Sequence, residues 1–174
     1  MRHVVFVLAS LFLSYFAPPS SVAVSKSPCV YTEARCIAVN LAVTAETIAT
    51  TICVRGWTSD RNNHLRPDAG FVRDMKMKLG GAAGLAPKIA EAMILDHIIP
   101  LDLGGHPSDE SNLQLQEAVV AKLKDNVVHW LHALVCSGLA PLDAARAAIA
   151  KDWRTAEQQF EVPVTKGREA TSAR

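Results

Sequence analysis

The sequence predicts an α+β protein whose central unit is a strand, a loop, a second strand and a helix within residues 92–125. Residues 93–99 form a short apolar run rich in β-branched side chains, as in a buried strand. Residues 111–116 alternate polar and apolar side chains, as in a strand that returns after a turn. From residue 117 the apolar spacing becomes helical, and an Ala-rich stretch at 141–153 completes a predicted helical hairpin over 117–159.

The first 23 residues have the features of a secretory signal peptide. Arg2 precedes an apolar run over residues 4–17, and small residues at 20–23 provide a cleavage site. The apolar run is short for a membrane span and no second one follows, so we expect no stable membrane insertion after cleavage. An uncleaved anchor is the alternative. The remaining residues predict a single domain at 24–161 and a flexible tail at 162–174, in the periplasm or outside the cell.

All four cysteines would remain after cleavage at residue 23. An even number of cysteines in an exported chain indicates disulfides, with free buried thiols as the alternative. Three pairings are open, and proximity favours Cys29 with Cys36. The chain contains no Cys-x-x-Cys pair, so we do not expect a structural zinc site.

The segments before the central unit have weaker patterns. Residues 30–43 predict a strand or hairpin closed by Cys29 and Cys36, and the Thr-rich residues 48–54 predict another short strand or an extended segment. Residues 59–70 contain Asp, Asn, Pro and Gly in quick succession, which indicates a loop. Residues 71–79 predict an amphipathic helix that ends at Gly80-Gly81, and residues 82–87 a connector.

An ionisable pair, Asp96-His97, interrupts the first apolar strand. Charged groups in apolar surroundings need a partner or a metal, so this pair predicts a functional site. Gly104-Gly105 predicts the turn between the strands. The order of elements then places Asp96, His97, Asn112 and the first turn of the helix around one small cavity.

These residues carry a resemblance to a known family. The stretch Leu95-Asp-His-Ile-Ile-Pro-Leu-Asp-Leu-Gly-Gly105, followed by Asn112-Leu113 and Lys124-Asp125, resembles the HNH endonuclease signature of the ββα-metal fold. Cys53-Val-Arg-Gly-Trp-Thr58 and the segment from Leu131 to Gly138 are similar to segments of small bacterial and phage HNH-like proteins. The resemblance spans roughly residues 50–153 and implies a ββα-metal core.

The resemblance implies roles for individual residues in phosphodiester hydrolysis. His97 matches the general base, an imidazole that stays unprotonated near neutral pH and accepts a proton from water. Asp96 matches the acid that reaches the metal, and Asn112 matches the residue that holds the hairpin loop and orients the histidine. The resemblance also implies a disulfide between Cys53 and Cys136.

The third motif position departs from the family. Ala121 stands where the family places a His or Asn that binds the metal, and an alanine has no ligand atom. Glu117 lies one helical turn earlier, so its carboxylate becomes the candidate second ligand beside Asp96. The implied cofactor is a divalent metal, with Mg²⁺ expected first and Mn²⁺, Ni²⁺ or Zn²⁺ as alternatives.

The resemblance implies a nucleic-acid partner, DNA more than RNA, and the charge distribution is compatible with one. The formal net charge is only +1, but basic residues predominate at 55–78 and acidic ones at 88–117, a pattern that a mixed solvated surface also gives. Arg66, Lys122 and Lys124 are the candidate phosphate contacts. For Lys124 the alternative is an exposed salt bridge with Asp125 or another neighbour.

The sequence therefore predicts an exported, metal-dependent HNH-type endonuclease. The alternative is a non-catalytic descendant of the fold that acts as a binding or structural module in the periplasm, which Ala121 and the low net charge favour. A small exported toxin or inhibitor with an incidental motif is a third reading.

Overall fold

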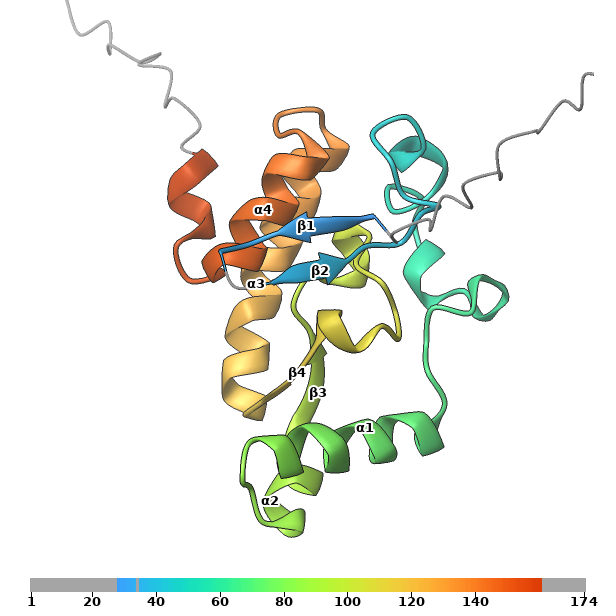
Figure 1. The fold of residues 1–174 in the computed structure, drawn as a ribbon. Coiled ribbons are helices and arrows are strands. Elements are labelled where there is room, and N and C mark those ends of the chain that lie inside the picture. Colours follow the sequence, from blue (N-terminus) through green and yellow to red (C-terminus); the bar gives the residue numbers. More distant parts are fainter. Residues whose placement is uncertain (1–27, 34, 161–174) are drawn as a thin grey trace, which may run out of the picture.

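The computed structural model describes residues 28–33 and 35–160 and has an α+β fold, as predicted (Figure 1). The predicted signal peptide at 1–23 and the predicted tail at 162–174 lie outside the described residues. No helix within the described ranges has the length and apolar character that crossing a bilayer requires. The helices and strands are β1 (Cys29–Tyr31), β2 (Cys36–Ala38), α1 (Ala69–Ala82), α2 (Pro87–Ala92), β3 (Ile94–His97), β4 (Leu113–Gln116), α3 (Ala118–Cys136) and α4 (Leu142–Asp152).

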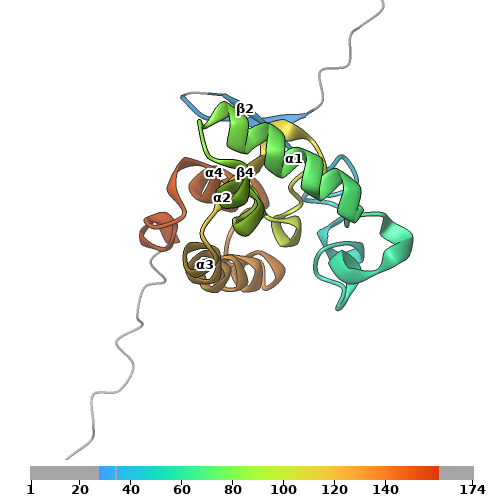
Figure 2. The ribbon, with the colours of Figure 1, turned by 90° about the horizontal axis from the view of Figure 1, so that it is seen from below.

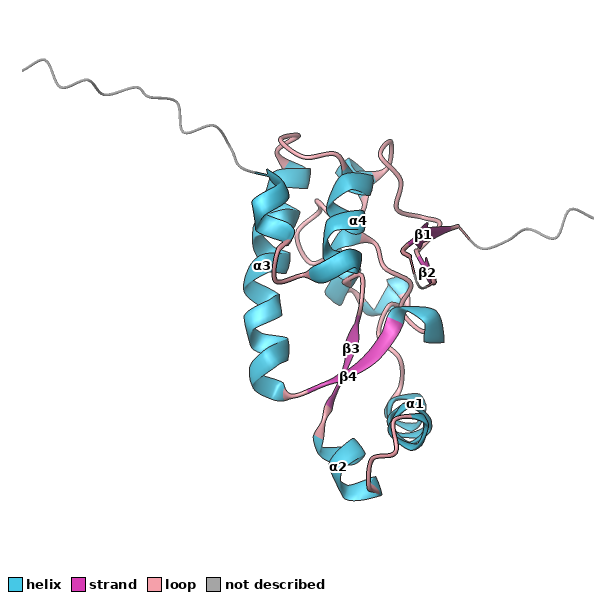
Figure 3. Ribbon diagram, turned by 60° about the vertical axis from the view of Figure 1, so that its left-hand side comes forward, coloured by secondary structure: helices cyan, strands magenta, loops and turns pink. Residues whose placement is uncertain are grey.

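The centre of the fold is the antiparallel hairpin of β3 and β4, which lies between α1 and α3 (Figures 2 and 3). Asp96 is paired with Gln114 and His97 with Leu113 across the hairpin. The turn that the two glycines predict is present: Gly104 has a φ of 70°, and a Cβ at Gly105 would overlap the carbonyl oxygen of Ile99.

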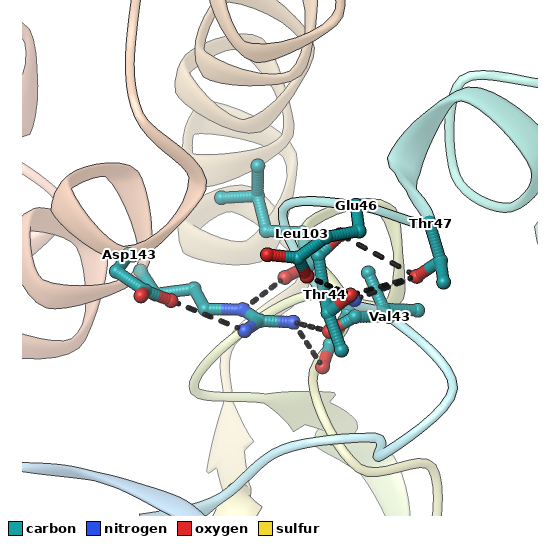
Figure 4. A network of polar contacts seen from close by, with 8 residues as sticks. Val43, Thr44, Glu46, Thr47, Leu103 and Asp143 are labelled. Carbon is teal, nitrogen blue, oxygen red and sulfur yellow. Dashed lines mark hydrogen bonds and ion pairs between the residues drawn. The ribbon is translucent and has the colours of Figure 1, made fainter.

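The core forms where α3 and α4 pack against each other and against the loop after β3. Its buried members include Ile99, Leu103, Leu131 and Ile149. Arg146 of α4 is also buried there, and its guanidinium donates to the carbonyl oxygens of Leu103 and Val43 (Figure 4). This arginine fixes the loop that connects β3 to β4, so the second helix of the predicted hairpin supports the central unit.

Both expected disulfides are confirmed. Cys29–Cys36 closes the β1–β2 hairpin, and Cys53–Cys136 joins the N-terminal half to the last residue of α3 across 83 positions of sequence. These two bonds pair all four cysteines of the sequence. Such bonds are typical of oxidising compartments outside the cytosol.

The strand or extended segment predicted at 48–54 is wrong. Residues Ile48–Thr50 form a 3₁₀ helix, and turns follow. Thr47 explains the difference, because its hydroxyl donates to the carbonyl oxygen of Ala42 and accepts from the backbone N–H of Thr44. Such local side-chain bonds stabilise turns and override the β-propensity of the threonines.

The helix predicted at 71–79 forms but is longer, because Gly80-Gly81 lies inside α1 rather than after it. Gly80 is buried against Ala90 of α2, and a Cβ at Gly80 would overlap that alanine. The glycine therefore permits a close contact between two helices instead of ending one. Helix α2, with Pro87 at its first turn, was not anticipated.

Candidate active site

Asp96 and His97 are the last two residues of β3, and they point to opposite faces of the hairpin because successive side chains of a strand alternate. The Asp96 side chain lies on the face that α3 covers, where it meets Lys124. The His97 side chain lies on the other face, against the loop at residues 106–109. The pair thus contributes one group to each of two environments.

On the α3 face, Asp96 forms a buried ion pair with Lys124. The Lys124 ammonium donates to Asp96 Oδ2 at 2.6 Å and also to the carbonyl oxygen of His97. The lysine side chain is only 2% exposed and that of Asp96 21%. Burial lowers the pKa of Lys124, and the charge of the Asp96 carboxylate opposes this shift. Gln114 Nε2 adds a long contact of 3.4 Å to the same carboxylate oxygen.

The placement of Lys124 corrects its expected role. A phosphate contact requires an accessible ammonium, but this one is held inside the protein by Asp96, and the pair is not the exposed salt bridge considered as the alternative. Lys122 and Arg66 are exposed, and neither belongs to an ion pair within the described ranges. They remain candidate phosphate contacts, although no contact connects either of them to Asp96 or His97.

On the opposite face, His97 is held in one tautomer. Its Nε2 lies 2.9 Å from the carbonyl oxygen of Pro107. A carbonyl oxygen only accepts, so Nε2 carries the hydrogen and Nδ1 of the neutral ring carries the lone pair. Burial lowers the pKa of His97, although the Pro107 carbonyl and the charge of Asp96 act in the other direction. Burial therefore favours the neutral ring, in which Nδ1 is the basic nitrogen.

Asn112 holds the loop that supplies the Pro107 carbonyl. It is fully buried; its Oδ1 accepts from the backbone N–H of Ile99 at 2.8 Å, and its Nδ2 donates to the carbonyl oxygens of Ile99 and His106. The Nδ1 atom of His106 accepts from the backbone N–H of Asp109 at 2.9 Å, which closes the same loop. These bonds join both ends of the connection between β3 and β4, and so fix the position of Pro107 relative to His97.

The donor set around Asp96 does not fit a divalent metal as it stands. Lys124 already supplies the positive charge at this carboxylate, and Ala121 offers no ligand atom. Glu117 is exposed at the N-cap of α3. Among the described residues, the group that brings three candidate ligand atoms within 4.8 Å is Cys53, His132 and Cys136. Its two sulfurs form a disulfide, so it lacks the thiolates that a metal would require.

The chain was also compared with known proteins. No match was found among family models, curated proteins or solved structures. The function is therefore argued from the residues and their geometry.

The spacing of residues in the sequence indicates that Lys124 is buried. Lys124 falls in the same helical stripe as Val120, Val127 and Leu131, at offsets of four, three and seven residues. That spacing places it toward the core, where an ammonium requires an acidic partner. The carbonyl of Pro107 has no comparable signal, because a backbone acceptor is available at every residue.

Proposed function

We propose that this chain is an exported HNH-type endonuclease that hydrolyses phosphodiester bonds of nucleic acid, with DNA the favoured substrate. The observation that carries the proposal is the position of the His97 imidazole: the Pro107 carbonyl lies 2.9 Å from its Nε2, which leaves Nδ1 as the basic nitrogen, and burial lowers the pKa of the ring. Hydrolysis of a phosphodiester needs a base that is positioned before the substrate arrives and is unprotonated at neutral pH.

In this proposal His97 Nδ1 accepts a proton from the attacking water. The ring then carries a positive charge, which the Pro107 carbonyl stabilises; the charge of Asp96 acts in the same direction and that of Lys124 against it. Asn112 is a positioning residue, because it holds the loop that orients the ring and does not itself touch the reacting atoms. The order β3, β4, α3 agrees with the ββα core that the resemblance implies.

The proposal includes a divalent metal. A cation such as Mg²⁺ would use Asp96 and Glu117, and would polarise the phosphate. Lys124 already donates to Asp96 Oδ2, so a cation at this carboxylate would compete with its ammonium.

The second candidate function is the non-catalytic binding or structural module. The ion pair of Asp96 with Lys124 favours it, because a carboxylate that a buried ammonium already neutralises has less need of a metal. Ala121 favours it for the same reason.

The experiment is cleavage of supercoiled plasmid by the purified, oxidised protein in Mg²⁺, Mn²⁺, Ni²⁺, Zn²⁺ or EDTA. The endonuclease proposal predicts nicking, and the His97→Ala variant should lose about 100-fold to 10,000-fold of the rate, as expected when a general base is removed. His129→Ala, which changes an exposed histidine on α3, is the matched control and should retain the rate.

Two outcomes contradict the proposal. Nicking that His97→Ala leaves unchanged would remove His97 as the base. Absence of nicking by a folded protein in every metal would favour the non-catalytic module. Nicking in EDTA would leave the base in place and exclude the metal.

A further inference from the structure

A small cavity of about 250 Å³ borders the loop that orients His97. It is lined by residues 39–41, 63–65 and 106–107, and is here called the Pro107 cavity. The carbonyl oxygen of Pro107 lies 2.9 Å from His97 Nε2, and the charge of His106 acts to lower the pKa of His97. The cavity therefore lies beside the proposed base, and its lining contains no residue of α3.

The lining of the Pro107 cavity is neutral and partly apolar. The three segments contain no aspartate, glutamate, lysine or arginine. Val39 and Leu65 are buried in its wall, whereas Leu41 is 69% exposed. The volume is below the range of about 300–1,000 Å³ that is typical of sites for larger ligands. This cavity suits one small, uncharged group better than a phosphate, which would require a cation.

Two asparagine amides of the lining are held in a defined orientation. Asn40 Oδ1 accepts from the backbone N–H of Ala42 at 2.9 Å, which leaves Asn40 Nδ2 as a free donor. Asn63 Nδ2 donates to the carbonyl oxygen of Trp57 at 2.8 Å, which leaves Asn63 Oδ1 as a free acceptor. The opposite orientation of either amide would place donor against donor or acceptor against acceptor.

The His106 imidazole supplies a second free donor. Its Nδ1 accepts from the backbone N–H of Asp109 at 2.9 Å and from that of Ser108 at 3.3 Å. The hydrogen of the neutral ring is therefore on Nε2. A metal would need a lone pair on Nε2, which this tautomer does not have, so His106 is suited to donate a hydrogen bond and not to bind a metal.

These three free atoms are available to a ligand. None has a hydrogen-bond partner among the residues that the structure describes, and none is enclosed, because the buried side-chain atom without a partner in that part of the chain is Gln116 Oε1. Two donors and one acceptor complement a group with two acceptors and one donor. The pairing edges of thymine, uracil and cytosine each have this composition, whereas guanine has one acceptor and two donors, and adenine has one of each.

We propose that the Pro107 cavity is a subsite for one unpaired pyrimidine base of the substrate, with Asn40 and His106 donating to its acceptors and Asn63 accepting from its N–H group. The inference rests on the proposed function, because it gives that endonuclease a preference among nucleotides. A base within a duplex uses this edge for its partner strand, so the subsite selects single-stranded or locally opened nucleic acid. The apolar side chains contact the faces of the ring.

The experiment measures fluorescence anisotropy of fluorescein-labelled oligothymidylate and oligodeoxyadenylate of about ten nucleotides with the purified, oxidised protein in EDTA. The readout is the ratio of the two dissociation constants, because contacts to the phosphates affect both strands alike. We expect oligothymidylate to bind about fivefold more tightly or better, which is the lower end of the discrimination that a pair of specific hydrogen bonds gives.

Asn40→Asp tests the first donor. The new side chain keeps the acceptor for the Ala42 N–H and replaces the free donor by an acceptor oxygen, so the ratio should fall to within about twofold of one. Asn62→Asp makes the same change in charge at an exposed asparagine outside the lining. It should weaken both strands equally and leave the ratio unchanged.

His106→Asn tests the second donor. The Asn oxygen takes the place of Nδ1 and still accepts from the loop, but the shorter side chain does not reach the position of Nε2. The ratio should again fall, while the melting temperature stays close to that of the wild type. A lower melting temperature with an unchanged ratio would give His106 a structural role only.

The subsite and the endonuclease fail separately. Equal binding of the two strands, no binding of either, or a ratio that Asn40→Asp and His106→Asn both leave unchanged overturns the subsite, even if the protein nicks plasmid through His97. A thymidine preference that depends on Asn40 and His106, in a protein that nicks nothing, supports the subsite and contradicts the endonuclease.

Discussion

The two faces of the β3–β4 hairpin provide different partners for the two ionisable residues that end β3. On the α3 face, the Asp96 carboxylate is neutralised by the buried ammonium of Lys124 at 2.6 Å. On the opposite face, His97 has a backbone carbonyl at 2.9 Å as its partner and keeps a basic nitrogen. One face is electrostatically satisfied, whereas the other retains a group that can accept a proton.

This difference gives the two adjacent residues different roles: Asp96 contributes mainly to stability, and His97 mainly to the proposed chemistry. The ion pair joins α3 to the end of β3, so its loss should be felt mainly as instability. The imidazole makes one hydrogen bond, so its loss should be felt mainly in function. The sequence Asp-His alone does not distinguish these roles, because the adjacent positions differ only in the face that each side chain enters.

The largest expected loss of stability involves neither face of the β3–β4 hairpin, so it is a reference for the losses expected on each face. Replacing Cys53 and Cys136 by Ser removes a disulfide that spans 83 positions, and the chain-entropy model predicts a loss of about 4–5 kcal/mol in the free energy of unfolding. The matched variant at Cys29 and Cys36, which spans 7 positions, should lose about 2–3 kcal/mol. Urea denaturation measures both losses. Equal losses would contradict the expectation that the bond closing the longer loop stabilises the protein more.

The next effect tests the satisfied face. Asp96→Ala leaves the Lys124 ammonium buried without a counter-charge and should cost about 4 kcal/mol in urea denaturation. Lys124→Met in the same background should restore most of that loss, because it removes the uncompensated charge. A double variant as unstable as Asp96→Ala would show that the lysine is not the reason for the cost.

Asn112→Ala tests the loop on the other face. The change leaves the backbone N–H of Ile99 and the carbonyls of Ile99 and His106 without their partner, which should cost about 3 kcal/mol. Gln114→Ala, an amide on the same hairpin whose contact is long at 3.4 Å, should cost less than about 1 kcal/mol. Hydrogen exchange of the Ile99 amide checks the cause, since its protection should fall in the Asn112 variant alone.

The sequence predicts correctly those elements whose residue patterns are local. The runs around Asp96 and Asn112 gave β3 and β4, helical spacing and Ala-rich composition gave α3 and α4, and cysteine count with proximity and resemblance gave both disulfides. It failed at 48–54, where hydroxyl bonds of Thr47 decide the backbone, and at Gly80, whose buried contact with Ala90 comes from tertiary packing.

The candidate site divides in the same way. Residue types identified Asp96, His97 and Asn112 as the positions of interest, but their partners are long-range and could not be read from spacing. Lys124 lies 28 positions from Asp96, and the Pro107 carbonyl lies in a loop whose path depends on Asn112. A metal at Asp96 was inferred from motif resemblance, whereas the geometry gives that carboxylate a lysine.

The account depends most on the state of His97, and long-range ¹H–¹⁵N correlation spectra of its imidazole during a pH titration measure that state directly. We expect the Nε2–H tautomer at pH 7 and a pKa below the ordinary value of 6.5, because burial disfavours the charged ring. The folded state then binds fewer protons than the unfolded state, so the contribution of His97 to stability should fall as the pH drops below about 6.5. An Nδ1–H tautomer, or a ring still charged at pH 7, would contradict the assignment of His97 as a positioned base.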